Sequence, residues 1–177
     1  MKLKLVIIVV ACLGQLTASA VSCPRPLPRQ IMGKVIIPKI HVDVSVKEGT
    51  ADDAAVPGPY PVHYRRTALP GEGGTVVISG HHFTHPLPGA RGGVFLHLDQ
   101  LRRGDSIYLT LRRRFGKGNY RYVVTSNRTV DCGYTVAGFK YCKRALTLMK
   151  RFNQDKLYLV TCEGAGYERQ VVTAFAA

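Results

Sequence analysis

A cysteine, a histidine and an arginine each stand at the edge of an apolar stretch. Cys162 closes the run 157–161, Arg169 comes seven residues later, and His81 follows the apolar run 75–79. Because positive charge and partial exposure favour the thiolate, a cysteine beside an arginine is a candidate nucleophile. The imidazole could move protons near neutral pH, and the guanidinium could hold the substrate or stabilise an oxyanion. Spacing alone leaves a reactive and an inert Cys162 equally open.

The other four cysteines fall in different surroundings. Cys12 lies inside an apolar N-terminal segment and Cys23 precedes a proline-rich stretch, so neither is expected in a folded core. Cys132 and Cys142 flank a turn-rich loop, and in an oxidising compartment they would close a disulfide. The alternative is two free buried thiols. A disulfide there leaves Cys162 as the odd cysteine of the chain.

The N-terminus has the pattern of an export signal. A short basic start is followed by the apolar residues 5–14 and by residues 18–20, which resemble a small-residue cleavage site. We therefore predict that residues 1–20 form a signal peptide or an uncleaved membrane anchor. A lipoprotein-type site at Cys23 is the weaker alternative, because Ala20 stands where such sites usually have leucine. Each option places the rest of the chain outside the cytoplasm, at the cell surface.

Length and composition fit one folded domain after the targeting segment. The chain has 177 residues; the proline-rich residues 21–33 are predicted to be a linker and residues 34–177 the folded domain. The 25 Lys and Arg residues against 11 Asp and Glu give a net charge of +14, which favours anionic partners. The basic clusters lack interleaved aromatic residues, so no nucleic-acid partner is predicted. A non-catalytic basic β-module that binds an anionic cell-wall polymer is the alternative to an enzyme.

The apolar patterning is mainly that of short strands. Alternating or continuous apolar runs predict strands at residues 34–37, 41–46, 75–79, 105–111, 120–125, 157–161 and 171–175. Residues 49–74 are rich in proline and glycine and predict a long excursion, whereas residues 144–152 are the best helix candidate. Seven or eight short strands with few helices predict a closed or nearly closed β-barrel.

Several motifs stand in a recognisable order along the chain. They are Ile37–Ile40, Thr67–His81, Phe95–Leu101 followed by Gly104-Asp105, Leu159–Cys162 and Arg169–Val172. The Pro-Gly-Glu segment that leads to Gly80-His81 and the Leu-x-Thr-Cys signature are together specific. In this order the motifs resemble those of the sortases, the cysteine transpeptidases of the bacterial cell surface. The resemblance covers nearly everything from about residue 35 to the C-terminus.

This resemblance implies a fold, an activity and a set of site residues. The implied fold is mainly β, an eight-stranded sortase-type barrel with one or two short helices. Cys162 would be the nucleophile, His81 the catalytic histidine and Arg169 the active-site arginine. The implied reaction cleaves an LPxTG-like sorting signal through a Cys thioester and transfers the protein to an amine, with hydrolysis as a side reaction. The implied partners are secreted proteins with a C-terminal sorting signal and an amine acceptor, either a peptidoglycan precursor or a pilin lysine.

Three residues near the motifs are candidate substrate-binding residues. Tyr158 stands where the family usually has threonine, which bears on substrate preference. Thr161 would contact the substrate or support the strand. His82 directly follows His81, and because strand alternation points neighbours to opposite sides, one of the two would face the thiol. The short tail after Arg169 is similar to the compact sortase classes D, E and F.

The histidines do not predict a metal site. His81, His82 and His85 form a small cluster, but no acidic ligand stands nearby in the sequence to complete a zinc set. We therefore predict neither a metal nor another cofactor.

Overall fold

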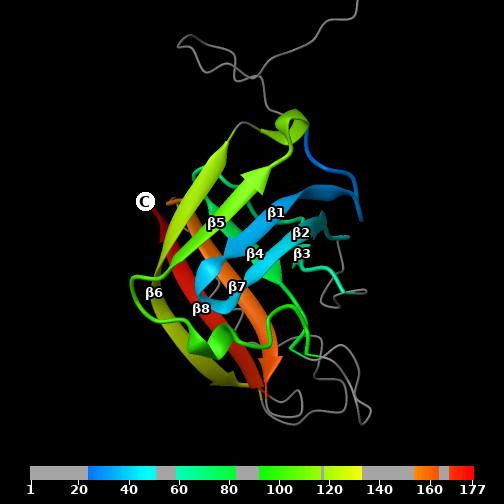
Figure 1. The fold of residues 1–177 in the computed structure, drawn as a ribbon. Helices are drawn as coiled ribbons and strands as arrows, with labels where there is room; N and C mark the ends of the chain where they lie inside the picture. Colours follow the sequence, from blue (N-terminus) through cyan, green and yellow to red (C-terminus); the bar gives the residue numbers. More distant parts are fainter. Residues whose placement is uncertain (1–23, 51–58, 83–91, 117, 133–153, 164–167) are drawn as a thin grey trace, which may run out of the picture.

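The protein forms an eight-stranded closed barrel (Figure 1). The computed structural model describes residues 24–50, 59–82, 92–116, 118–132, 154–163 and 168–177. The strands are β1 (Ile31–Ile37), β2 (Val42–Glu48), β3 (Val62–His63), β4 (Thr75–Ser79), β5 (Ser106–Leu111), β6 (Asn119–Asp131), β7 (Lys156–Glu163) and β8 (Glu168–Ala176). Short 3₁₀ helices among these residues are η1 (Pro38–Ile40), η2 (Leu98–Gln100) and η3 (Arg113–Phe115). The predicted eight-stranded β-barrel is thus confirmed.

The strand order around the barrel is β1-β2-β3-β4-β7-β8-β6-β5. Most neighbours are antiparallel, but β2 pairs with β3 and β4 pairs with β7 in parallel. Parallel strands finish at the same edge of a sheet. The residues that follow β4 and those that end β7 therefore meet at one end of the barrel, which we call the site end.

Two strands differ from their predicted bounds. β3 lies inside the excursion predicted for residues 49–74, and a two-residue strand is too short to show periodicity. β6 extends to Asp131 beyond its predicted end, because an irregularity between Val124 and Ser126 shifts the register and interrupts the alternation. The helix predicted at residues 144–152 lies outside the described residues. None of the helices within the described ranges is long and apolar enough to cross a membrane.

The first strand begins three residues before the strand predicted at residues 34–37. β1 begins at Ile31, and Pro26 before it is buried. The Arg25 guanidinium donates to the carbonyl oxygen of Thr67 at 2.8 Å and to a Glu72 carboxylate oxygen at 3.1 Å. Proline composition suggested a linker, but these hydrogen bonds fasten the segment to the turn before β4.

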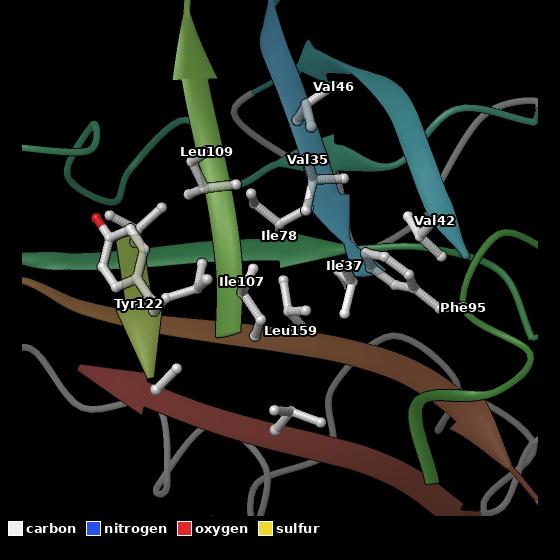
Figure 2. Packing of buried hydrophobic residues seen from close by; sticks show 14 of the residues in the cluster. Val35, Ile37, Val42, Val46, Ile78, Phe95, Ile107, Leu109, Tyr122 and Leu159 are labelled. Atoms are coloured by element: carbon white, nitrogen blue, oxygen red, sulfur yellow. The ribbon is translucent and has the colours of Figure 1, made fainter. Parts of the chain in front are cut away.

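Apolar side chains from β1, β2 and β4 to β8 fill the barrel interior (Figure 2). Alternation decides which residues point inward, so Leu157 and Leu159 of β7 enter the interior while Tyr158 and Val160 do not. The latter two pack on the outer face with Val77 of β4 and other residues. Burying one such side chain contributes about 1.5–3 kcal/mol. β7 is a continuous apolar run because it is covered on both faces.

A half-buried aspartate and a buried histidine–glutamate pair join neighbouring parts of the barrel. The Tyr122 hydroxyl donates to Asp155 Oδ1 at 2.7 Å, and the amide of Gly71 donates to Asp155 Oδ2 at 2.9 Å. This carboxylate connects β6, the start of β7 and the turn before β4. On the other side, the buried His63 Nδ1 lies 2.9 Å from Glu48 Oε2. Buried polar groups in these pairs are thereby satisfied.

Replacing Tyr122 by Phe keeps the ring in the core but removes the hydroxyl that Asp155 accepts from. Hydrogen bonds to charged groups contribute about 1.5–3 kcal/mol. We expect Tyr122→Phe to lower the free energy of unfolding in urea by that amount. Tyr60→Phe is the control, because Tyr60 is 39% exposed and its replacement should change stability by less than about 0.5 kcal/mol.

The same hydroxyl predicts how stability changes at alkaline pH. Burial first, and then the hydrogen bond and charge of Asp155, raise the pKa of Tyr122 far above its ordinary value. A raised pKa stabilises the fold below the pKa of unfolded tyrosine, and this contribution declines as the pH rises above about 10. The wild-type protein should therefore lose stability above about pH 10 more steeply than Tyr122→Phe. Equal slopes in the two proteins would contradict this expectation.

Candidate active site

Cys162 and Arg169 lie directly opposite each other on β7 and β8. The antiparallel register pairs these two residues, one pair beyond Thr161 and Gln170. Residues opposite in an antiparallel pair share a face and have Cβ atoms about 4.5–5.5 Å apart. Cys162 is a free thiol of intermediate exposure, and Arg169 is also partly buried. A thiol and a permanent positive charge are therefore neighbours at the site end.

His81 approaches the same place from β4. Ser79, the last residue of β4, is paired with Val160 of β7. The amide of Gly80 donates to the Val160 carbonyl oxygen at 3.0 Å, so the parallel ladder continues past the end of β4. His81 comes one residue after Gly80, just past the end of β4. The backbone thus brings Cys162 and Arg169 on β7 and β8, and His81 after the neighbouring β4, to one end of the barrel.

The site lies on the outer face of the sheet. Tyr158 and Val160, which alternate with inward residues of β7, belong to the outer cluster, and Cys162 continues their series. On β8, Arg169 continues the series of Val171, which lies in the same cluster. The apolar outer cluster therefore forms the floor next to the thiol, while the barrel interior lies behind it.

The segment from Gly93 to Phe95 holds the backbone of His81 and His82. The amide of Phe95 donates to the His81 carbonyl oxygen at 3.0 Å, and the amide of Gly93 donates to that of His82 at 2.7 Å. Phe95 itself is buried beside Ile37 in the core (Figure 2). A Cβ atom added to Gly93 would lie 2.1 Å from the His81 carbonyl oxygen. Only glycine allows this close approach without a backbone shift.

The predicted substrate-binding residues occupy different positions. Tyr158 is 1% exposed and lies in the outer cluster, on the same face as Cys162. Thr161 is 2% exposed, and alternation points it away from the face of Cys162, toward Gln170. His82 is partly buried at the site end. Their substrate contacts stay predictions, and the position of Thr161 favours support of the strand over contact with a peptide.

Two residues near the site had no clear signal in the sequence. Ser79 lies on the outer face two residues before His81, and its buried hydroxyl has no hydrogen-bond partner among the described residues. In the sequence, the only indication that Ser79 lies near the site is its position two residues before His81. Gly93 adjoins His81 only through folding, because twelve residues separate the two in the sequence. No local pattern could have identified it.

A polar network supports the inner side of β8 beneath the site. Gln170 accepts a hydrogen bond from the Thr129 hydroxyl at 2.7 Å and donates to Asn127 Oδ1. The Asn127 amide then donates to the carbonyl oxygens of Leu98 and Leu101 at 2.8 and 2.9 Å. This network fixes β8 next to Arg169 and connects it to the helix that follows Phe95.

The disulfide and metal predictions are tested only in part. Cys132 is disulfide-bonded, but Cys142, its expected partner, lies outside the described residues, so the pairing stays a prediction. Within the described ranges, no group of three or more His, Cys, Asp or Glu side chains is arranged to hold a metal ion. His85 also lies outside those ranges.

Comparison with known proteins places this arrangement in a family. The family model of the sortase domain matches residues 35–177, which is most of the chain. The chain belongs to the sortase family. It is similar to Sortase D of Bacillus subtilis (strain 168), with 29% identity over 143 residues, 81% of this chain and 60% of that relative. The chain thus spans about three fifths of the length of this curated sortase.

Solved sortase structures share the barrel. One is a Sortase D5 transpeptidase of Clostridium perfringens, with a TM-score of 0.65, 21% identity and coverage of 86% of this chain and 82% of the other. Another is a lid mutant of Sortase A from Corynebacterium diphtheriae, with a TM-score of 0.65, 22% identity and coverage of 85% and 72%. At this identity the likeness concerns the fold. The similarity to Sortase D is consistent with the compact class expected from the short tail.

Gly93 allows a direct test of how this sortase positions His81. We expect Gly93→Ala to displace the His81 backbone; with His81 in its predicted catalytic role, this would lower the transpeptidation rate by about 100-fold, as a misplacement of about 1 Å can do. Gly92→Ala is the matched control, because its added Cβ would meet the far end of the flexible Leu96 side chain. Both variants are compared in a steady-state transpeptidation assay and in urea unfolding. Full activity in a folded Gly93→Ala protein would contradict the role assigned to this close approach.

Proposed function

We propose that the protein is a cell-surface sortase that cleaves an LPxTG-like sorting signal through a thioester on Cys162. The observation that carries this proposal is the pairing of Cys162 with Arg169 across β7 and β8, at the end of the barrel where the neighbouring β4 ends two residues before His81. Family membership supports transpeptidation in general. The specific signal, the acceptor and the roles of the individual residues belong to the proposal.

In the first step, Cys162 Sγ attacks the carbonyl carbon of the scissile peptide bond. An S–C bond forms, the C–N bond breaks, and His81 gives a proton to the leaving amine. The segment after the cleaved bond departs, and the remaining protein stays on the enzyme as a thioester. The half-buried Arg169, opposite Cys162, stabilises the oxyanion that forms on the carbonyl oxygen.

In the second step, an amine from a peptidoglycan precursor or a pilin lysine attacks the thioester. His81 takes a proton from the incoming amine, the C–S bond breaks, and a new amide bond joins the protein to its acceptor. Water in place of the amine would give slow hydrolysis. Cys162 is partly exposed on the outer face, so in this proposal both substrates approach from that side.

The neighbouring residues have supporting roles in this proposal. The buried Tyr158 ring forms part of the floor on the face of Cys162, so its size affects which peptide side chain fits there. His82 is the neighbour of the catalytic histidine and adjoins the peptide. Thr161 holds β7 from the inner face rather than touching the substrate. Exchange of Tyr158 for the more usual threonine should therefore alter peptide preference.

Trapping of the acyl-enzyme tests the proposed nucleophile. Full-length protein is incubated with a library of sorting-signal peptides and an amine, and intact-protein mass spectrometry detects adducts. We expect wild type to form a thioester adduct with at least one peptide and Cys162→Ala to form none. If a folded wild-type protein forms no adduct with any peptide, the proposed function fails. Salt-sensitive binding to a wall polymer that is indifferent to Cys162→Ala would instead favour the non-catalytic β-module.

Arg169 can be tested separately from the nucleophile. We expect Arg169→Ala to lower kcat/KM for the best peptide by about 100-fold or more, because a fixed donor to the oxyanion is lost. Arg169→Lys keeps the charge but not the planar donor geometry and should restore only part of the rate. As a control, the alkylation of Cys162 by iodoacetamide is measured in each variant, to show that the thiol stays accessible. An unchanged kcat/KM in folded Arg169→Ala would remove this residue from the mechanism.

A further inference from the structure

The Ser79 hydroxyl is a buried polar group that the proposed mechanism leaves unused. Ser79 is 6% exposed, and its Oγ atom has no hydrogen-bond partner among the described residues. A buried hydroxyl can donate one hydrogen bond and accept two, and leaving it unpaired lowers stability. Native proteins pair most buried polar side-chain atoms, so an unpaired one needs an explanation. Ser79 stands two residues before His81, which places it beside the candidate site.

The hydroxyl faces the outer side of the barrel wall. Val77, two residues earlier on β4, lies in the outer cluster, whereas Ile78 enters the interior. A Cβ atom added to Gly80 would lie 2.5 Å from the ring of the core residue Phe95, so Gly80 also faces inward. Because side chains alternate along a strand, Ser79 between these two inward residues points outward. It therefore lies on the same face as the candidate nucleophile.

Apolar side chains flank Ser79 across the sheet. The register pairs Ser79 with Val62 of β3 on one side and with Val160 of β7 on the other, and both valines are buried. Val160 pairs in turn with Val171 of β8. Ser79 is therefore the polar member of a row across four strands that otherwise consists of valines. None of these valines has a side-chain polar atom that could pair with its hydroxyl.

This row of valines and Ser79 lies close to the pair formed by Cys162 and Arg169. Cys162 is two residues after Val160 on β7, which is about 6.6 Å along the strand. Because β4 and β7 are neighbours about 4.8 Å apart, the Cα atoms of Ser79 and Cys162 are about 8 Å apart. An extended peptide spans that distance with two or three residues, since each adds about 3.3 Å.

The part of the substrate that matches this position precedes the cleaved bond. In the proposed function, that part stays on the enzyme through both steps, so contacts with it hold the substrate throughout. The leucine and proline that open an LPxTG-like signal are apolar and suit the valines of the row. Every residue of the signal has a carbonyl oxygen, whereas proline lacks the N–H. A hydroxyl that donates can therefore pair with the backbone of any of these residues.

We propose that the Ser79 hydroxyl donates a hydrogen bond to a backbone carbonyl oxygen of the sorting signal, two or three residues before the cleaved bond. This inference rests on the proposed function and adds a substrate-binding residue to it. The hydroxyl is enclosed in the free protein, so the arriving peptide displaces the groups that cover it. Pairing then contributes to the free energy of binding, because it satisfies a donor that the fold leaves unpaired.

A double-mutant cycle between protein and peptide tests this contact. The peptide is the one that gives the most adduct with wild type, and the mass of that adduct identifies the cleaved bond. In a series of thioamide peptides, sulfur, a weaker acceptor, replaces one carbonyl oxygen at a time. Each peptide is assayed for kcat/KM with full-length wild type and full-length Ser79→Ala. Ser106→Ala is the matched control, because Ser106 lies on β5, which borders none of the strands β4, β7 and β8.

We expect Ser79→Ala to lower kcat/KM about fivefold, the usual effect of one lost hydrogen bond. Sulfur at one carbonyl, two or three residues before the cleaved bond, should lower the kcat/KM of wild type by a similar factor and leave that of Ser79→Ala unchanged. The urea unfolding midpoint of Ser79→Ala should equal or exceed that of wild type, because the substitution removes an unpaired hydroxyl. Ser106→Ala should match wild type with every peptide.

Three results would overturn this inference. They are an unchanged kcat/KM in Ser79→Ala, losses from Ser79→Ala and from every thioamide that simply multiply, and a lowered unfolding midpoint without coupling to any thioamide. The last result would assign the hydroxyl a partner within the folded protein, such as a bound water. Absence of turnover by wild type would refute the proposed function and this inference with it, whereas the three results above refute this inference alone.

Discussion

The parallel pairing of β4 with β7 is the constraint on which the rest of the site depends. It brings the end of β4 and the end of β7 to one edge, although about eighty residues separate them in the sequence. The hydrogen bond from Gly80 to Val160 carries the ladder one residue beyond β4, so His81 follows at the end of the barrel that holds Cys162. A shift of one residue would turn Cys162 toward the barrel interior, because side chains alternate along a strand.

This register is held by burial on both faces of β7. Leu157 and Leu159 pack in the barrel, while Tyr158 and Val160 pack outside it, so slippage would place mismatched side chains on both faces. β8 is fixed from the inner side by the hydrogen bonds of Gln170. Both faces of β7 therefore supply stability, and the partly exposed Cys162 lies on the outer face just past the buried Tyr158 and Val160.

Local patterns in the sequence determined the strands and the reactive residue types. Alternating and continuous apolar runs predicted most strands and the β-barrel, and the motifs around His81 and Cys162 predicted the family. β3 and the early start of β1 escaped prediction, since two residues show no period and proline suggested a linker before Ile31. Only the tertiary structure decided the neighbours: the face shared by Cys162 and Arg169, the inward position of Thr161, and the close approach of Gly93 to His81. These depend on strand register and on contacts between distant segments, which no local pattern encodes.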